Sequence, residues 1–188
     1  CDSYARAYLM LCTAAGLECM YVSGTAGSDA KGWGPHGWNL VKLGGSWYHV
    51  DVTWGDPVFA GAWEDGNGIT VMNYNYLCCT DSEIRTTHMP DEGVVSFPPC
   101  TDDSYNYYKI NGMYYDTWDK GVIYDALMAS VQNGESAIVM KFVFSNDMTA
   151  SDVLFTFKHV AAQLRTAAMY ACMDLANAEM PDDYTLVI

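Results

Sequence analysis

Three residue types that together perform nucleophilic catalysis stand within the first 51 residues: the thiol of Cys1, the imidazole of His36 and the carboxylate of Asp51. In such a set the thiolate attacks a carbonyl carbon, the imidazole moves the proton, and the carboxylate holds the imidazole in the required tautomer. This chemistry needs the three side chains close together. The surrounding sequence therefore has to place them on elements that pack against one another.

The stretch HGWNLVKLGGSWYHVDVTWGDP, residues 36–57, predicts a β-hairpin. Both arms are rich in β-branched and aromatic residues, which favour strands. Gly44-Gly45 between the arms suits a two-residue turn that needs positive φ angles. The resulting register pairs Leu43 with Ser46, Leu40 with His49, Trp38 with Asp51, and His36 with Thr53.

In this register the imidazole and the carboxylate share one face of the hairpin. Side chains alternate faces along a strand, so His36 and Asp51 become diagonal neighbours, about 7–8 Å apart at the backbone. His49 shares that face nearer the turn, where we expect a structural role. Asn39 and Tyr48 point to the other face and are expected to pack there.

The stretch CDSYARAYLMLCTAAG predicts a helix that starts at Cys1 and stops at Gly16. The apolar face of this helix is formed, at helical spacing from Cys1, by Ala5, Tyr8, Leu9 and Cys12. The free N–H groups and the macrodipole at a helix N-terminus favour the thiolate, which is the nucleophilic form of cysteine. Cys1 is therefore the predicted nucleophile.

Together these motifs resemble the transglutaminase-like core of bacterial proteins, within the papain-like cysteine protease superfamily. The matching pieces are CDSYA at Cys1, GLECMYVSG at Gly16, HGWN at His36 and WYHVDVTWGDP at Trp47. The resemblance implies Cys1 as nucleophile, His36 as base and Asp51 as orienting carboxylate. It implies thiol-dependent acyl transfer or hydrolysis on protein or peptide amides, by a transglutaminase-like acyltransferase or a cysteine peptidase. No metal or cofactor is needed for this chemistry.

Other interpretations of these residues stay open. A lipidated cysteine of a bacterial lipoprotein normally precedes a flexible tether, whereas a helix follows Cys1 directly. An N-terminal nucleophile that uses its own amine would leave His36 and Asp51 without a role. The competing functional class is a non-catalytic cell-surface binding module on the same scaffold. A metal-binding protein is a third class, which rests only on the numbers of Cys and His residues.

Tryptophans near these motifs have two interpretations. Trp33, Trp38 and Trp54 could line an aromatic groove for an extended peptide substrate, or they could be packed in the core. His88, further along, is interpreted as a loop histidine. Asp56 is interpreted as part of a turn with Pro57.

The predicted fold class is α+β, with a nucleophile helix packed on an antiparallel sheet. Residues 17–23 predict a strand and residues 24–34 a mobile, glycine-rich loop. Residues 73–79 predict an extended segment, and residues 80–83 have the residues of a helix cap. Pro98-Pro99 marks the boundary between a transglutaminase-like core, residues 1–100, and an appended small α/β unit, residues 104–188.

The appended unit is predicted to have a β-α-β-α-β order. Its expected elements are strands at 105–110 and 113–115, a helix at 119–132, a strand at 136–144, a helix whose apolar stripe runs from 153 to 175, and a strand at 184–188. Ile123, Leu127 and Val131 form the apolar face of the first of these helices.

Composition limits the classes of partner. The chain has 188 residues with a net charge of −14, which argues against nucleic acid and against an anionic membrane surface. No run approaches the roughly 18 apolar residues that span a bilayer. We expect a protein or peptide substrate and an extracellular or cell-surface bacterial location. The chain has no initiator Met and no signal peptide, which predicts a fragment or a processed form.

Cysteine usage leaves two possibilities. Seven cysteines are present, and they could be buried structural thiols or, for six of them, a disulfide framework. There is no C-x-x-C pattern, and the adjacent Cys78-Cys79 pair has poor spacing for zinc. No metal ligand is therefore predicted.

Overall fold

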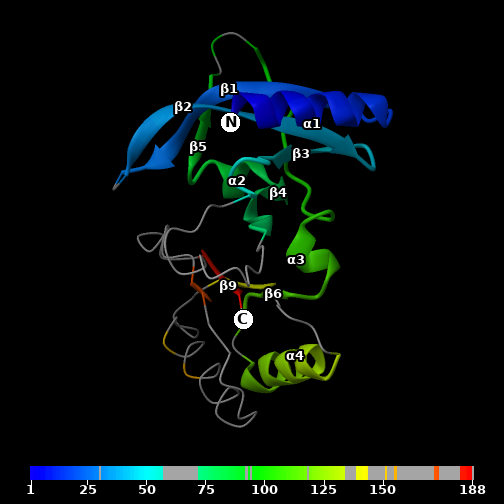
Figure 1. Cartoon of the computed structure of the whole chain (residues 1–188), viewed down its shortest axis with the longest axis vertical. Coiled ribbons are helices and arrows are strands. Elements are labelled where there is room, and N and C mark those ends of the chain that lie inside the picture. The colour runs from blue at the N-terminus through cyan, green and yellow to red at the C-terminus, as the bar shows by residue number, and fades with distance from the viewer. Residues whose placement is uncertain are drawn as a thin grey trace, which may run out of the picture. The chain divides into compact units, whose positions relative to one another are not determined.

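The computed structural model describes residues 1–29, 31–56, 72–91, 93, 95–117, 119–133, 139–143, 151, 155, 172–173 and 183–187. Contacts divide the chain into two compact units. The described residues of the first unit are those up to 56 and those from 72 to 110, and the second unit takes the described residues from 111 onward. Figure 1 shows the elements of both.

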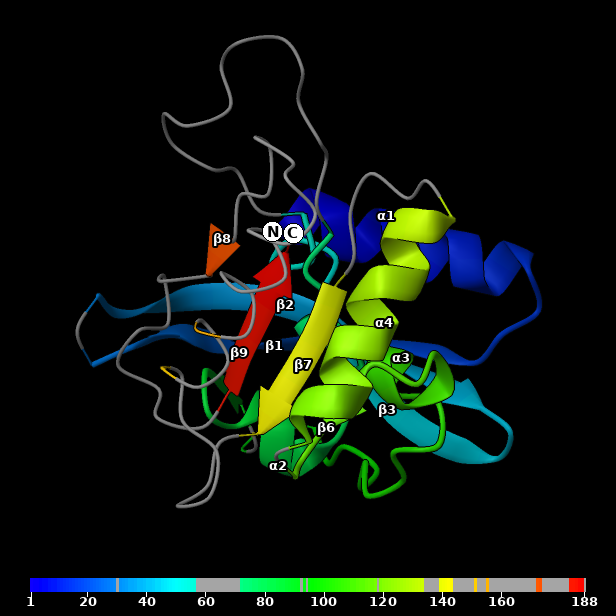
Figure 2. The same ribbon diagram turned by 90° about the horizontal axis from the view of Figure 1, so that it is seen from below.

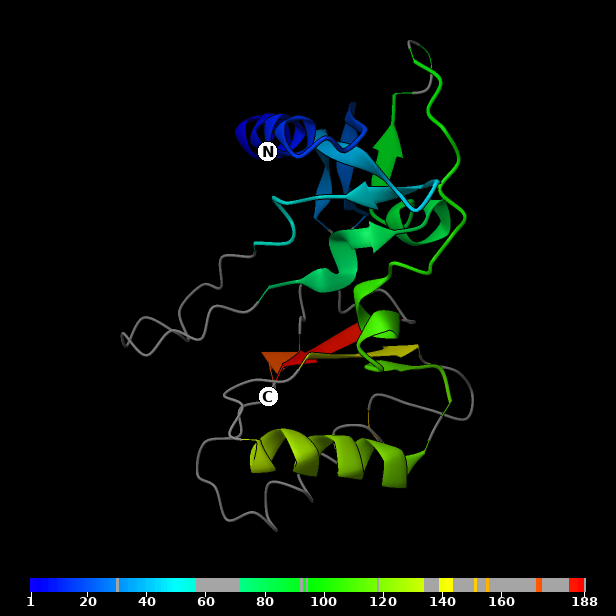
Figure 3. The ribbon, with the colours of Figure 1, turned by 90° about the vertical axis from the view of Figure 1, so that its right-hand side faces the viewer.

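The first unit packs a helix on a five-stranded antiparallel sheet, which confirms the predicted α+β class. Its elements are α1 (Asp2–Ala14), β1 (Cys19–Ser28), β2 (Gly32–Leu43), β3 (Ser46–Val50), the 3₁₀ helix η1 (Tyr74–Tyr76), β4 (Leu77–Cys79), α2 (Asp81–Ile84), β5 (His88–Pro90) and α3 (Tyr107–Ile110). The strand order is β4-β3-β2-β1-β5. In Figures 1 and 3, α1 lies along β1 and β2.

The predicted hairpin turn and two of its four predicted pairs are confirmed. Gly44 and Gly45 have φ angles of +59° and +96°. Leu43 pairs with Ser46 and Leu40 pairs with His49, but the ladder ends where Asn39 pairs with Val50. Beyond that point the backbone N–H of Asp51 donates to the carbonyl oxygen of Tyr76 at 2.9 Å. Asp51 is therefore no longer paired with β2. The predicted pairs of Trp38 with Asp51 and of His36 with Thr53 are wrong.

The predicted loop at residues 24–34 is wrong, because β1 continues to Ser28 and β2 begins at Gly32. Gly24 in this stretch makes room for the backbone of a neighbouring strand. A Cβ added to Gly24 would lie 2.2 Å from the carbonyl oxygen of Met89, which belongs to β5, whereas a Cβ at Gly32 or Gly34 would meet nothing within 4 Å. Gly24 therefore reflects close packing of paired strands and not a loop.

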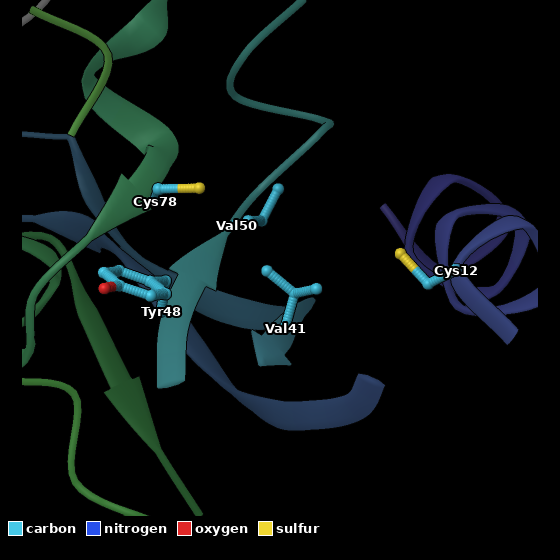
Figure 4. Close-up of a cluster of buried hydrophobic side chains, with 5 residues drawn as sticks. All are labelled: Cys12, Val41, Tyr48, Val50 and Cys78. Atoms are coloured by element: carbon cyan, nitrogen blue, oxygen red, sulfur yellow. The ribbon is translucent and has the colours of Figure 1, made fainter. Parts of the chain in front are cut away.

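The helix α1 follows its prediction. It ends at Ala14, and Gly16 takes a φ of +76°, as expected of a helix stop. Ala5 and Cys12 are buried, while Tyr8 and Leu9 are partly buried. Figure 4 shows the Cys12 side chain reaching from α1 toward the sheet residues of one hydrophobic cluster, which are Val41, Tyr48, Val50 and Cys78.

The two residues predicted to lie on this second face of the hairpin do so. Tyr48 is fully buried in the cluster beneath α1. The Asn39 side-chain amide donates to the carbonyl oxygens of Ala5 at 3.0 Å and Met20 at 3.3 Å. Asn39 therefore connects the first turns of α1 to the sheet.

The predicted cap of α2 is confirmed, since Thr80 and Glu83 form a reciprocal capping box. The strand predicted at residues 105–110 is wrong. The side chain of Asn106 accepts from the backbone N–H groups of Tyr108 and Lys109, and this cap starts the helix α3 instead. Local capping thus outweighs the strand propensity of the tyrosines.

Residues just after 100 lie in the first unit. The Tyr48 hydroxyl donates to the carboxylate of Asp102 at 2.6 Å, and Tyr108 is fully buried. The division into domains at 1–100 and 104–188 stays a prediction about which segments fold independently.

The second unit combines the helix α4 (Lys120–Gln132) with the strands β6 (Tyr114–Tyr115), β7 (Val139–Val143), β8 (Cys172–Met173) and β9 (Asp183–Val187), in the sheet order β6-β7-β9-β8. Figures 2 and 3 show α4 running alongside this sheet. Ile123 and Leu127 of α4 are buried, as predicted.

The last predicted helix lies mainly outside the described residues, and the prediction of a helix is wrong at Cys172–Met173, which form a strand. Within the described part of the chain, no helix combines the length and the apolar character that a bilayer crossing requires.

Candidate active site

The predicted hydrogen bond between His36 and Asp51 is confirmed. His36 Nε2 lies 2.6 Å from Asp51 Oδ2, with side chains that are 8% and 1% exposed. The ring of Trp38 stacks on the imidazole with a centroid distance of 6.2 Å. A short bond in a dry setting is stronger than its equivalent in water.

The turn that follows β3 fixes the carboxylate of Asp51. Its second oxygen, Oδ1, accepts from the backbone N–H groups of Thr53 at 2.8 Å and Trp54 at 3.1 Å. This is the turn in which an aspartate side chain accepts from N–H groups two and three residues ahead. The sequence D-V-T-W therefore holds the carboxylate in place through its own backbone.

His88 is not a loop histidine, and that interpretation is corrected. It begins β5 and is fully buried, with Nε2 at 2.9 Å from the same Asp51 Oδ2 and Nδ1 at 2.8 Å from Thr87 Oγ1. β5 pairs with β1, so that Ala26 lies opposite His88 while Gly24 lies opposite His36. Positions 24 and 26 share a face of β1, which brings both imidazoles to the same side.

Charge at this site follows from burial and hydrogen bonding. Burial of Asp51 would raise its pKa, but the hydrogen bonds from His36 and His88 outweigh it and bring the pKa to about 2. Burial lowers the pKa of His88 by more than the neighbouring carboxylate raises it. Asp51 is therefore an anion at neutral pH, and His88 is a neutral donor beside it.

Aromatic rings enclose His88, with centroids 4.7 to 5.6 Å from its own: Trp54, Trp38 and Tyr76. Trp38 is 0% exposed, so the packing interpretation holds for it and it does not line a groove. Trp33 is 37% exposed and its indole N–H donates to Asp29. A substrate groove at Trp33 and Trp54 stays a prediction.

Cys1 is exposed and stands at the N-cap of α1, where its carbonyl oxygen accepts from the N–H of Ala5 at 3.0 Å. The Tyr21 hydroxyl donates to Asp2 at 3.0 Å, and a Cβ added to Gly37 would lie 2.2 Å from that hydroxyl. The start of α1 is thereby placed beside the residue that follows His36.

A second contact places the same helix turn beside Asp51. The Tyr4 hydroxyl donates to Asp56 Oδ2 at 2.9 Å, and Asp56 lies in the turn that Asp51 begins. Among the described residues, however, no hydrogen bond joins Cys1 to His36, and His36 Nδ1 takes no hydrogen bond. A contact between Cys1 Sγ and His36 Nδ1 therefore stays a prediction.

His49 belongs to a second polar cluster. The Trp38 indole N–H donates to His49 Nδ1 at 3.0 Å, and His49 Nε2 donates to Asp81 Oδ1 at 2.9 Å. The indole can only donate, so Nδ1 carries no proton and the ring is neutral. Burial, which lowers the pKa of His49, agrees with this state.

Cys100 lies near that cluster but is poorly suited to be a nucleophile. Burial, and to a lesser extent Asp81, raises the pKa of its thiol to about 12. A cavity of about 360 Å³ borders the cluster, and its lining combines the polar residues His49, Asp81, Arg85 and Ser96 with the apolar residues Pro90, Val95, Phe97, Pro98 and Pro99.

Two groups of residues bring metal-ligand atoms within 4.8 Å of one another: His36, Asp51 and His88, and His49, Asp81 and Cys100. In both, the nitrogen–oxygen distances of 2.6 to 2.9 Å are hydrogen-bond distances, with a proton between the atoms. A cation would have to displace these protons. We therefore assign both groups as hydrogen-bonded networks.

Six cysteines have side chains that the structure describes, and these six are thiols that form no disulfide bond with one another. Four of them, Cys12, Cys78, Cys79 and Cys100, are buried, as the structural-thiol interpretation expects. Cys19 is partly buried and Cys1 is exposed. Of these thiols, Cys1 alone stands at the N-cap of a helix.

Comparison with known proteins agrees with this arrangement. A sequence model of the transglutaminase-like superfamily matches residues 1–52. Kyphoscoliosis peptidase from Homo sapiens is 40% identical over 62 residues, and the Mus musculus protein is 39% identical over 62 residues. Each match covers 29% of this chain and 9% of the relative, so the chain spans less than a tenth of the curated relatives it matches. Residues 1–52 of this chain are thus similar to the transglutaminase-like superfamily, and the α+β arrangement of the first unit is consistent with a core of that kind.

Proposed function

We propose that this chain is a cysteine-dependent enzyme that transfers the acyl group of a protein or peptide amide to water or to an amine. Cys1 is the proposed nucleophile, His36 the proton carrier and Asp51 the orienting carboxylate. The name of the curated relatives, kyphoscoliosis peptidase, supports the hydrolytic direction. The acidic net charge supports the extracellular or cell-surface location, which stays a prediction together with a bacterial origin.

The observation that carries the proposal is the 2.6 Å bond between His36 and Asp51 beside the start of α1. Because Nε2 is bound to the carboxylate, Nδ1 is the nitrogen available for a thiol. The carboxylate itself is held by backbone N–H groups and cannot turn away without breaking them. This is the geometry that an imidazole needs to exchange a proton with a fixed partner.

The proposed reaction has two halves. The Cys1 thiolate attacks the amide carbonyl carbon and forms a C–S bond, and the C–N bond breaks as His36 gives its Nδ1 proton to the leaving nitrogen. Water or an amine then attacks the thioester and gives a proton to His36. The C–S bond breaks, which releases the acyl product and restores the thiolate beside the imidazolium.

A second candidate function is a non-catalytic binding module on the same scaffold. The absence of a hydrogen bond from Cys1 to His36, among the described residues, is the observation that favours it. In this alternative the thiol would be an ordinary exposed cysteine, and the imidazole–carboxylate pair would serve the fold.

Site-resolved alkylation separates the two candidates. A free thiol has a pKa of about 8.5, whereas a thiolate paired with an imidazolium at a helix N-terminus ionises several units lower. Cys1 should therefore react with iodoacetamide at about pH 6 at least 10-fold faster than a model thiol. His36→Ala should remove most of this advantage, and Asp51→Asn should remove less. Peptide mapping by mass spectrometry gives each rate.

The buried Cys12 is the internal control and should stay unlabelled. The amino group of Cys1 has to be acylated or peptide-linked in this experiment, since a free α-ammonium group would itself acidify the neighbouring thiol. If Cys1 labels at the rate of the model thiol, or if His36→Ala leaves the rate unchanged, the binding module is the better account.

A further inference from the structure

One oxygen of Asp51 receives two imidazoles. His36 Nε2 lies 2.6 Å and His88 Nε2 2.9 Å from Oδ2, while Oδ1 takes the two backbone N–H groups of the turn. A carboxylate oxygen has two lone-pair directions. His36 therefore shares the oxygen with His88, which lies 52 residues further along the chain and outside the hairpin of His36.

The carboxylate of Asp51 places a proton on His88 Nε2, because an ionised carboxylate oxygen can only accept. The Thr87 hydroxyl lies 2.8 Å from His88 Nδ1 and 3.4 Å from the carbonyl oxygen of Ile84, and at the shorter distance it can donate to Nδ1 of a neutral ring. Burial, which lowers the pKa of His88, keeps the ring neutral with its proton on Nε2. His88 thus offers Asp51 a neutral N–H and adds no positive charge to the site.

The groups that face His88 come from several elements. Among the described residues, the titratable ones are Asp51 after β3, His36 on β2 and Tyr76 on η1, whose ring centroid is 5.6 Å away. Trp38 and Trp54 form the remaining apolar contacts, and His49 lies beyond Trp38. Asp51 is the charged group to which His88 is hydrogen-bonded.

We propose that His88 is a positioning residue that acts on His36 through Asp51, by occupying half of the acceptor capacity of the shared oxygen. The inference rests on the proposed function for its catalytic meaning, but its geometry does not involve Cys1. With His88 present, Oδ2 binds the His36 N–H less strongly than an unshared carboxylate oxygen would. His36 can then release its proton to a leaving group more readily.

The inference is tested on His36 directly, in a Cys1→Ala background where no thiolate contributes. The titration of His36 is followed by NMR of its ring protons. His88→Phe keeps an aromatic ring but removes the donor, so the midpoint of the His36 titration should rise by about one pH unit. His88→Gln keeps an N–H near the Nε2 position and should bring the midpoint back toward the parent value.

A milder pair of variants guards against a misfolded His88→Phe protein. Thr87→Val removes the hydroxyl that holds the His88 tautomer and should shift the midpoint in the same direction by a smaller amount. Thr87→Ser keeps the hydroxyl and should not shift it. If His88 had only a structural role, its substitution would lower the stability of the protein but would not shift the His36 titration midpoints in this order.

Unchanged midpoints in both His88→Phe and Thr87→Val, in folded proteins, would overturn the inference. That result would leave the proposed function intact, because the Cys1 labelling advantage is measured separately in the chain that retains the thiol. Conversely, Cys1 could label no faster than the model thiol while the His36 midpoints shift as expected. That result would overturn the proposed enzyme function but would support the coupling of His88 to His36.

Discussion

At the scale of single residues, the carboxylate of Asp51 is tightly constrained. Its side chain is 1% exposed and its oxygens accept four hydrogen bonds, two from imidazoles and two from backbone N–H groups. Removing charge here has to affect stability as well as reactivity, because all four donors are arranged around an anion.

Acid should destabilise the protein through this residue. The pKa of Asp51 falls from its ordinary 3.8 to about 2, so the folded state binds the proton less tightly than the unfolded state. The resulting stability, about 2 kcal/mol, is complete above about pH 4 and lost as the pH falls toward 2. Urea unfolding from pH 7 to pH 2 should therefore show Asp51→Asn less stable at pH 7, with the gap to wild type narrowing in acid.

The exposed Asp116 supplies the control, since Asp116→Asn should show a small gap that changes little over this range. A gap for Asp51→Asn that stays constant from pH 7 to pH 2 would contradict the ionised, hydrogen-bonded state.

Two of the three groups in this network were predictable from sequence for a definite reason. His36 and Asp51 belong to one hairpin, and a two-residue glycine turn fixes their register locally. His88 reaches the site because β5 pairs with β1, which is a contact between distant segments of the chain. β5 has three residues, and so short a strand shows no recognisable pattern in the sequence. The Thr87-His88 pair just after a capped helix was the available signal.

At the scale of elements, the position of β5 depends on the absence of a side chain at Gly24. A Cβ there would meet the Met89 carbonyl oxygen at 2.2 Å and the Trp38 ring at 2.9 Å. Gly24 therefore sets how closely β5, which carries His88, approaches β1.

Gly24→Ala should destabilise the first unit by about 1–3 kcal/mol, as expected of a side chain forced into a packed site. Gly34→Ala is the matched control on β2, because a Cβ at Gly34 meets nothing within 4 Å. It should change stability by less than about 0.5 kcal/mol. Denaturant unfolding measures both, and equal effects would show that the approach of β5 is not limited by Gly24.

Element prediction succeeded where local signals agreed and failed where they competed. α1 has an apolar stripe and a glycine stop, and both appear in the structure. Around α3, alternating tyrosines favour a strand but the Asn106 cap favours a helix, and the cap prevails. The glycines of residues 24–34 predict a loop, and the sequence does not show that the distant strand β5 packs against Gly24.

At the scale of the whole molecule, the segment after the Pro98-Pro99 pair is bound to the core by several contacts. Asp102 accepts from Tyr48, Asn106 donates to Glu83, and the rings of Tyr107 and Tyr74 stack 3.6 Å apart. These contacts join distant parts of the sequence, so composition alone did not reveal them. They indicate that the core needs residues beyond 100.

Two truncated chains test this. Residues 1–110 should unfold at a higher temperature than residues 1–100, by at least about 5 °C, because the longer chain keeps the buried Tyr108 and the contacts of residues 102–107. Thermal unfolding followed by circular dichroism measures the difference. Equal midpoints would instead support the boundary at residue 100.

The long separation between Asp51 and His88 has a consequence for the order in which the chain is made. Translation delivers Cys1, His36 and Asp51 well before His88, and domains begin to fold during synthesis. Until β5 has left the ribosome, the edge of β1 has no partner and Asp51 lacks one of its donors. The nascent chain therefore carries an imidazole and a carboxylate whose hydrogen-bond network is complete only when residue 90 has emerged.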